Sequence, residues 1–381
     1  MTAALFEPLQ VRSLRLKNRI VISPMMQHAA LGGFANNWHL VHLGKFALGG
    51  AGLIFTESTA VSPVGRIGKD DAGMWLDEHV APWKNVVDFV HEHGAAIGIQ
   101  LGHAGRKAGS KALWEGGDAL SQEEMSDVDP RWVRIGPSAV AAGEGWSVPD
   151  EMTHGDIEQV VQQFVDATRR SDAAGFDVVE LHFGHGYLVT SFLSPVSNLR
   201  TDEYGGSREG RMRLALCIAR SVRAVWPDGK PLWCRLSVVD GAVGGWGVED
   251  TVELVRALQA AGVDVIDCSS GGLTEQTKAL PVPRGLGFQV PFSRRIKRDT
   301  GAMTQAVGMI VDARQAEEIV ESGAADLIAI GREALYDPYW PVHAQATLDR
   351  DPKYRDWNLR HRVWLEKRQV FFDRLKEEKA E

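Results

Sequence analysis

Residues 175–188 read GFDVVELHFGHGYL, a largely apolar run that ends in polar and glycine residues. The apolar part, VVELH at 178–182, predicts a β-strand buried on both faces, as the strands of parallel sheets are. Seven further runs of this kind occur along the chain, and segments with helical patterns separate them. These runs lie at 19–25, 53–58, 96–101, 232–237, 265–270, 304–310 and 327–332.

The segments between these runs have apolar residues at helical spacing, at 77–93, 153–174, 208–226, 249–261 and 311–322. Several of them end at a glycine, which favours a helix C-terminus. Parallel strands need such crossover connections, and eight of them close into a cylinder. The sequence therefore predicts the α/β class and a (β/α)8 TIM barrel. A doubly wound open sheet is the alternative, which the number of strands disfavours.

The chain of 381 residues exceeds the roughly 250 residues that a bare barrel needs. We therefore expect one barrel domain over residues 1–381, enlarged by an insertion and a tail. The insertion, 109–138, follows the third strand and is expected to form a lid at the carboxyl end of the barrel. The tail, 360–381, is predicted to be a highly charged helix with an apolar stripe, packed on the barrel rim or on a neighbouring subunit.

Composition and charge exclude several other classes of protein. The formal net charge of −8 gives no general attraction for nucleic acid or anionic lipid. The cysteines Cys217, Cys234 and Cys268 include no CxxC pair, which excludes a disulfide framework and a thiolate zinc site. No apolar run approaches the ~18 residues of a membrane span, and no signal peptide is visible. We expect a cytoplasmic protein that acts on a small molecule, without a nucleic-acid or membrane partner.

Residues at the carboxyl ends of barrel strands are the candidates for function. His182 and His185 stand there, three residues apart, after the strand at 178–182. One interpretation is a metal-binding pair, although His-x-x-His alone is a weak pattern for zinc. A second is a pair of N–H donors that converge on one substrate oxygen. A third is two loop histidines with structural hydrogen bonds, and their position alone does not decide between the three.

A phosphate site is expected after the seventh and eighth strands, where barrels bind anions on backbone N–H groups. Gly308, Gly331 and Arg332 stand there, and the alternative is a tight turn with a solvated arginine. No P-loop lysine or GxGxxG fingerprint occurs, so the barrel loops themselves would have to hold a nucleotide-like ligand.

Other polar residues of the strands and helices are expected to have structural roles. Glu57, Glu180 and Asp267 could form a glycosidase-like carboxylate pair, but we expect the barrel wall to satisfy them. His39 and His42 stand one helical turn apart and are also expected to be structural. No GxSxG elbow supports covalent hydrolysis.

Seven motifs occur in order along the chain: SPM at 23–25, GIQLGHAGRKA at 98–108, GFDVVELHFGHGYL at 175–188, FLSPVSNLRTDEYGGSREGR at 192–211, DCSSGG at 267–272, AVGMI at 306–310 and ADLIAIGRE at 325–333. In these motifs the chain resembles the Old Yellow Enzyme family of FMN-dependent ene-reductases. It is most similar to the bacterial branch that contains the thermophilic-like enzymes and the xenobiotic reductases. The resemblance extends from Phe6 to about Pro341.

The resemblance implies FMN as the cofactor, no metal, and NADPH or NADH as a reductant that alternates with the substrate at the flavin. It implies that His182 and His185 bind the carbonyl or nitro oxygen of the substrate. Tyr187 would deliver a proton, and Lys107 would lie near the pocket. The implied cofactor contacts are Ser23, Pro24, Met25, Ala60, Gln100 and Arg235 around the flavin ring, and Gly308, Gly331 and Arg332 at the phosphate.

The implied reaction is hydride transfer from NAD(P)H through flavin to the C=C bond of α,β-unsaturated carbonyl compounds, and to nitro compounds. Two residues at the substrate side depart from the branch's pattern: Met26 and His28 replace its usual Cys and Tyr. A thioether cannot donate a hydrogen bond, and histidine is shorter than tyrosine and titrates near neutrality. These departures leave open a flavin-dependent dehydrogenase, demethylase or monooxygenase on the same scaffold. A non-catalytic flavin-binding protein is a third hypothesis, which the intact set of His182, His185 and Tyr187 disfavours.

The resemblance also bears on assembly. Members of this branch tend to insert a C-terminal arginine into the active site of a neighbouring subunit. A homodimer or homotetramer is therefore implied, with Arg360 and Arg362 as the candidate residues.

Overall fold

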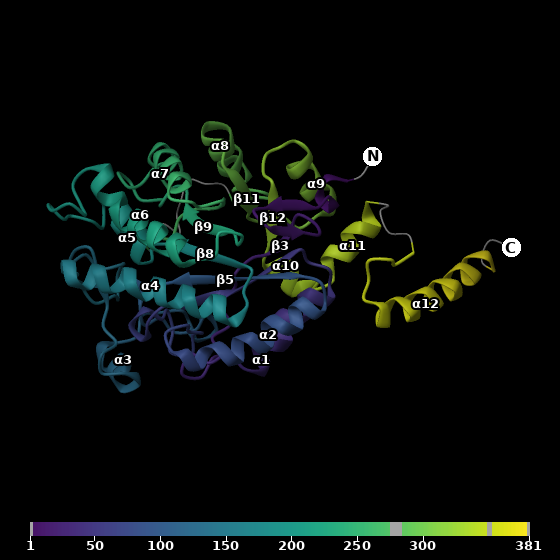
Figure 1. Cartoon of the computed structure of the whole chain (residues 1–381), viewed down its shortest axis with the longest axis horizontal. Coiled ribbons are helices and arrows are strands. Elements are labelled where there is room, and N and C mark those ends of the chain that lie inside the picture. Colours follow the sequence, from purple (N-terminus) through teal and green to yellow (C-terminus); the bar gives the residue numbers. More distant parts are fainter. Residues whose placement is uncertain (1–2, 275–283, 349–352, 379–381) are drawn as a thin grey trace.

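The computed structural model describes residues 3–274, 284–348 and 353–378, and a closed barrel of eight parallel strands forms its centre (Figure 1). Each barrel strand pairs with the barrel strand that follows it in the chain, and the last pairs with the first. This closure confirms the predicted (β/α)8 barrel and excludes the open sheet. The barrel strands are Ile20–Ile22 (β3), Leu53–Ala60 (β4), Ala96–Gly102 (β5), Val178–Phe183 (β8), Leu232–Ser237 (β9), Val265–Ser269 (β10), Met303–Val307 (β11) and Leu327–Ile330 (β12).

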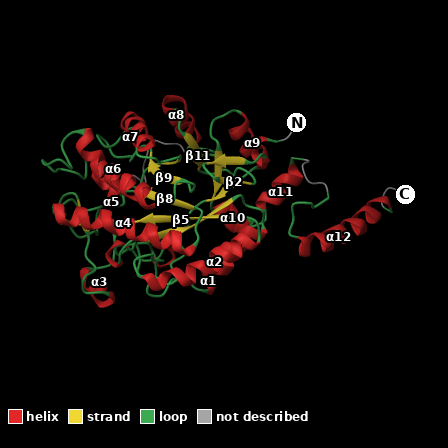
Figure 2. Ribbon diagram, viewed as in Figure 1, coloured by secondary structure: helices red, strands yellow, loops and turns green. Residues whose placement is uncertain are grey.

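Helices lie outside the strands, as the red ribbons around the yellow arrows in Figure 2 show. The helix at His154–Ala174 (α4) begins where the side chain of Thr153 accepts from Asp156 N and ends at Gly175, whose φ is 92°. The other long helices beside the barrel are Asn37–Leu48 (α1), Val80–Glu92 (α2), Arg208–Val225 (α6), Val248–Ala260 (α7), Val290–Thr300 (α8) and Ala313–Glu321 (α9). The remaining helices are Gln122–Val128 (α3), Leu188–Leu193 (α5), Arg332–Tyr336 (α10), Trp340–Thr347 (α11) and Leu359–Glu377 (α12).

A hairpin that the sequence analysis did not predict covers the amino end of the barrel. It consists of Leu9–Val11 (β1) and Leu14–Leu16 (β2), paired antiparallel. Val11 and Leu16 are buried in one cluster with Trp233 and with the first residues of several barrel strands. The amino end of the barrel is therefore packed with apolar side chains.

Nearer the carboxyl ends of the strands, the barrel carries polar residues. They are Gln100, Glu180, Arg235, Asp267 and Gln305, one from each of five neighbouring strands, and we call them the polar ring. Gln100 and Glu180 are register partners, and Asp267 is the partner of both Arg235 and Gln305. All five are buried, so the polar ring lies within the barrel.

The insertion and the tail differ in how they relate to the barrel. The insertion contains α3, whose Met125 is buried, and it joins the barrel through Arg134, which donates to the carbonyl oxygens of Ala108 and Leu120. The tail is helical as expected, but α12 contains no buried residue and extends away from the barrel (Figure 1). None of the described helices is long and apolar enough to span a membrane.

Candidate active site

The loop that follows β8 places His182 and His185 beside each other. Nδ1 of His185 lies 3.4 Å from Nε2 of His182, and the loop bends at His185, whose φ is 61°. The backbone N–H of His185 donates to Ser237 Oγ at 2.8 Å, which anchors the loop to β9. Gly186 follows at φ 76°, and a Cβ there would lie 2.1 Å from the carbonyl oxygen of Gly272. The tight approach of these two loops therefore requires a glycine at position 186.

Both imidazoles of this pair are neutral at pH 7. Burial, with the nearby charge of Arg235, lowers the pKa of His182 to about 3. Burial also lowers the pKa of His185 well below its usual value, and Arg235, His182 and Lys107 lower it further. Each ring therefore offers one N–H donor and one acceptor nitrogen.

Among the residues that the structure describes, no carboxylate, cysteine or third histidine joins the histidine pair in a metal-ligand cluster. Within the described ranges, one group of residues has metal-ligand geometry, formed by His154, Asp202 and Glu203 at the surface. Asp202 in that group already pairs with the guanidinium of Arg200.

Tyr187 and Lys107 lie next to the histidine pair. The rings of Tyr187 and His182 meet edge to face, with centroids 5.2 Å apart, and burial raises the pKa of the Tyr187 hydroxyl. Lys107 Nζ donates to the carbonyl oxygen of His185 at 3.1 Å and to that of Gly272. Lys107 thus ties the loop after β8 to the loop after β10.

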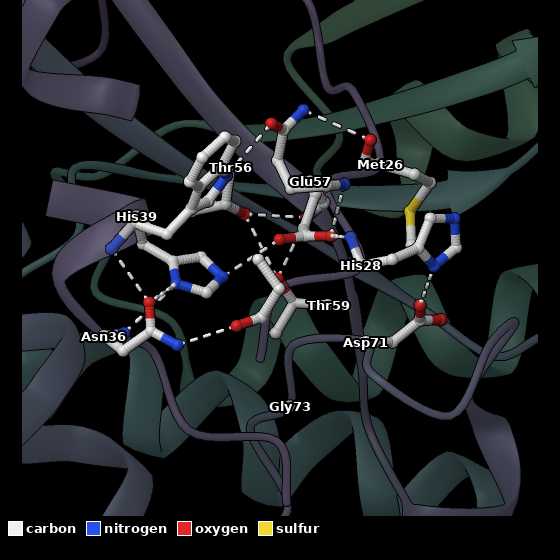
Figure 3. Close-up of polar contacts among 12 residues, drawn as sticks. Met26, His28, Asn36, His39, Thr56, Glu57, Thr59, Asp71 and Gly73 are labelled. Carbon is white, nitrogen blue, oxygen red and sulfur yellow. Dashed lines mark hydrogen bonds and ion pairs between the residues drawn. The ribbon is translucent and has the colours of Figure 1, made fainter. Parts of the chain in front are cut away.

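Met26 and His28 lie in the loop after β3, which buried polar groups hold in place (Figure 3). Glu57 Oε2 accepts from the backbone N–H of Gln27 at 2.8 Å, and Glu57 Oε1 lies 3.0 Å from His39 Nε2. His39 therefore has the structural role that the sequence analysis expected. Glu57 is satisfied as predicted, and it supports the loop that carries Met26 and His28.

The side chain of His28 is held by Asp71 and meets the ring of Trp114 edge to face. Its Nδ1 lies 2.8 Å from Asp71 Oδ1, and Figure 3 shows the other ring nitrogen pointing away from Asp71. Asp71 Oδ2 accepts from the backbone N–H groups of Ile67 and Gly68. Burial lowers the pKa of His28, but the hydrogen bond and the charge of Asp71 outweigh burial and raise it overall.

One cavity of about 420 Å³ lies at the carboxyl end of the barrel, next to the histidine pair, although neither His182 nor His185 is among its lining residues. Met26, His28, Lys107 and Tyr187 line it together with Gly272. The insertion contributes Leu113, Gly116 and Gly117 to the lining, in agreement with its expected place at the mouth of the barrel.

A second cavity, of about 400 Å³, lies where β11 and β12 end. Its lining includes seven residues that the sequence analysis assigned to the cofactor: Ser23, Pro24, Met25, Arg235, Gly308, Gly331 and Arg332. Gly308 has a φ of 115°, and a Cβ there would lie 2.8 Å from Gln289 Nε2. Phe288 lines both cavities, which are therefore neighbours.

The residues of the second cavity fit FMN. The glycines at positions 308 and 331 leave backbone accessible beside the Arg332 cation, as a phosphate group requires. Arg235 and Ser23 also line the second cavity. Arg235 Nη1 donates to Ser23 Oγ at 2.9 Å, and Arg235 Nε faces Asp267 at 3.3 Å.

Two residues assigned to the cofactor, Gln100 and Ala60, do not line this cavity. Gln100 is 2% exposed and its Nε2 donates to Glu180 Oε1 at 2.7 Å, while Ala60 is 3% exposed. Gln100 and Ala60 are absent from the lining of the first cavity as well. The sequence analysis also missed Ser269 and Gln289, which bond to each other beside His185. Ser269 belongs to the DCSSGG motif, which was the available signal.

Comparisons with known proteins agree with this geometry. Residues 4–351 match the NADH:flavin oxidoreductase / NADH oxidase family. The NADPH dehydrogenase of Geobacillus thermodenitrificans is 44% identical over 351 residues, which cover 91% of this chain and 95% of that protein. Morphinone reductase in complex with tetrahydroNAD is 27% identical, with a TM-score of 0.74 and 90% of each chain covered. Histamine dehydrogenase from Rhizobium sp. 4-9 is 25% identical, with a TM-score of 0.75, and 91% of this chain covers 48% of that one.

The family match extends over most of the chain, and the fold and the two adjoining cavities agree with it. The chain therefore belongs to the NADH:flavin oxidoreductase family, the Old Yellow Enzyme family, and is an NAD(P)H-dependent flavin oxidoreductase whose cofactor is FMN.

Proposed function

We propose that this enzyme reduces the C=C bond of α,β-unsaturated carbonyl compounds and also accepts nitro compounds. The observation that carries the proposal is the neutral pair His182 and His185, 3.4 Å apart beside the cavity that Tyr187 lines. FMN, when bound, relays two electrons from NAD(P)H to the substrate. The chain must then bind the substrate, stabilise the charge that develops on it and supply a proton.

The histidine pair is proposed to bind the carbonyl or nitro oxygen. Negative charge grows on this oxygen during reduction of the C=C bond, and preorganised N–H donors in a buried site stabilise it. A neutral imidazole suits this role, because its donor remains fixed by the loop and no proton is lost to the substrate oxygen. Tyr187 is proposed to donate its hydroxyl proton to the α-carbon, either directly or through water.

The second cavity is the proposed place of the cofactor. Gly308, Gly331 and Arg332 would hold the phosphate, and Ser23, Pro24, Met25 and Arg235 would contact the ring. Ala60 and Gln100 would support the ring from the buried layer below. Met26, His28 and Lys107 line the first cavity and are proposed to contact the substrate.

The exposed tail leads to a proposal about assembly. α12 presents Val363, Trp364, Val370 and Phe371 to solvent, and none of its residues is buried. We propose that the chain is one barrel domain that pairs through α12 with a second copy, as a homodimer or homotetramer. Arg360 or Arg362 would then reach the neighbouring active site.

A flavin-dependent dehydrogenase, demethylase or monooxygenase remains the second candidate. Met26 and His28 favour it, because they change the donors at the substrate side, and histamine dehydrogenase is among the similar structures. Product analysis separates the candidates. With NADPH and 2-cyclohexen-1-one under argon, an ene-reductase yields cyclohexanone. Anaerobic reduction of the flavin by an amine without NADPH, and no cyclohexanone, would support the second candidate instead.

A further inference from the structure

The polar ring contains more acid than base. Glu180 and Asp267 are fully buried, and Arg235 is its one positively charged member. Gln100 Nε2 donates to Glu180 Oε1 at 2.7 Å, but Oε2 has no hydrogen-bond partner among the described residues. Asp267 Oδ2 lies 3.3 Å from Arg235 Nε, an ion pair on one side of the carboxyl group. The sequence analysis expected the barrel wall to satisfy both carboxyl groups. The wall gives each one a polar partner, Gln100 for Glu180 and Arg235 for Asp267.

Two carboxylates and one guanidinium would leave a net negative charge inside the barrel, which is costly where water is excluded. The neighbouring titratable groups do not compensate for it. Burial lowers the pKa of His182 to about 3, and burial raises the pKa of the Cys234 and Cys268 thiols, so all three are neutral. Burial and the charge of Asp267 raise the pKa of Glu180 to about 8. Burial and the repulsion between two carboxylates therefore favour a proton on this pair.

Arg235 connects these carboxyl groups to the cofactor cavity. Arg235 Nη1 donates to Ser23 Oγ at 2.9 Å, and both residues line the cofactor cavity. Arg235 Nε faces Asp267 at 3.3 Å. Arg235 is 8% exposed, so little water screens it from the carboxyl groups. A change in the charge of the carboxyl pair therefore changes the electrostatic potential in the cofactor cavity.

We propose that Glu180 and Asp267 share one proton beneath the flavin, and that reduction of the flavin strengthens their hold on this proton. The inference rests on the proposed placement of the flavin beside Arg235. At a pH high enough to remove the shared proton from the oxidised enzyme, reduction returns it to the pair. The two electrons come from NAD(P)H and the proton from solvent. Glu180 and Asp267 are thus positioning residues that act on the flavin through Arg235.

The shared proton can be observed without any turnover. Infrared spectroscopy distinguishes the C=O stretch of a protonated carboxyl group from the bands of a carboxylate. We expect such a band at pH 7 and its loss as the pH rises through about 8. Glu180→Gln and Asp267→Asn each leave one carboxyl group with one guanidinium, so each should remove that band. If neither variant removes any part of a protonated-carboxyl band, the shared proton does not exist.

Asp177→Asn is the matched control for the spectra. Asp177 lies at the amino end of the barrel, where its Oδ2 accepts from the backbone N–H of Ile97 and lies 2.8 Å from His91 Nε2. This variant also exchanges a carboxyl group for an amide, but it lies outside the polar ring. The band that Glu180→Gln removes should be unchanged in it.

The coupling to the flavin is tested by reduction potentials measured between pH 7 and 9.5. Above pH 8 the potential of the wild-type enzyme should fall more steeply with pH. The slope should increase by about 30 mV per pH unit, the value for one additional proton per two electrons. Glu180→Gln and Asp267→Asn should not show this steeper region. A wild-type potential without it, or variants that retain it, would overturn the coupling. A protein that takes up no FMN would instead contradict the proposed function.

Discussion

Ser269 Oγ lies 2.7 Å from Nε2 of His185, on the side of the imidazole opposite to His182. The hydroxyl group of Ser269 also donates to Gln289 Oε1 at 3.3 Å, and its contact with Nε2 fixes which nitrogen of the His185 ring carries the proton. The substrate oxygen proposed to bind here would then meet an imidazole of His185 whose tautomer is already set. Ser269 therefore connects β10 to the chemistry proposed for the loop after β8.

Ser269→Ala should lower the rate of enone reduction because it removes the hydrogen bond that selects the tautomer of His185. We expect a loss of about tenfold, the order of one hydrogen bond of ~1.4 kcal/mol. Ser269→Thr retains the hydroxyl group and should restore most of the rate. Equal rates in the Ala variant and the wild type would show that Ser269 does not set the tautomer.

His182→Ala and His185→Ala should each cost about 2–4 kcal/mol of transition-state stabilisation, as the loss of one oxyanion donor does. Phenols, which imitate the charged oxygen, should bind more weakly and lose their charge-transfer band with the flavin. Steady-state kinetics and phenol titrations measure both effects. His154→Ala is the control, because His154 is exposed and lines neither cavity. This variant should change neither the rate of reduction nor the binding of phenols.

Gly308→Ala should weaken FMN binding. The residue has a φ of 115°, and the added Cβ would lie 2.8 Å from Gln289 Nε2, in the wall of the cofactor cavity. Strain of about 1–2 kcal/mol corresponds to roughly tenfold weaker binding. Gly323→Ala is the matched control, since its φ is also positive, at 70°, but nothing lies within 4 Å of its Cβ. Equal dissociation constants for FMN in the two variants would contradict the placement of the phosphate.

Met26→Cys tests how far residue 26 tunes the flavin. A thiol can donate a hydrogen bond where the thioether cannot, and a donor near the flavin favours its electron-rich reduced form. We expect the midpoint potential to rise by about 30 mV, or ~1.4 kcal/mol for two electrons. Titration against a reference dye at pH 7 measures it. An unchanged potential would mean that Met26 only packs against its neighbours.

Acid should destabilise the protein partly through His103, which is 3% exposed. Burial lowers the pKa of His103 to about 4, so between pH 6.5 and 4 the unfolded chain binds a proton that the folded protein does not. Stability is then lost as the pH falls through this window, by up to ~1.4 kcal/mol per pH unit. His103→Asn can still accept from Gly105 N and should lose less stability between pH 7 and 5.5 in denaturant titrations. An identical loss of stability in the variant and in the wild type would contradict the assignment of this pH dependence to His103.

The barrel could be predicted because each central strand carries enough apolar residues to stand out between helical segments. Val178–Phe183 and Leu232–Ser237 are buried at every position, which is the pattern that the sequence shows directly. The hairpin of β1 and β2 could not be predicted, because three-residue strands have no measurable periodicity. Its role depends on contacts with Trp233 and other distant residues.

The residue types of the candidate site could be predicted from the sequence, but how deep in the barrel each residue lies could not. The resemblance identified His182, Arg235 and Gly308. Arg235 and Gly308 line the second cavity, and His182 lies against Tyr187, which lines the first. The same reasoning put Gln100 in contact with the cofactor, whereas its amide group bonds to Glu180. Depth within a barrel depends on register and side-chain direction across strands, which a single sequence does not contain. For the same reason, the sequence did not show that Glu180 Oε2 would lack a hydrogen-bond partner among the described residues.

The most direct test of the proposed function is a single-turnover reaction under argon. The enzyme is reduced with one equivalent of NADPH and mixed with 2-cyclohexen-1-one, while the flavin absorbance is followed. We predict that the enone reoxidises the flavin in one phase with formation of cyclohexanone, and that the reaction is slower by roughly 30-fold or more in His182→Ala. A flavin that stays reduced in the presence of the enone, or wild-type rates in His182→Ala and in His185→Ala, would contradict the account.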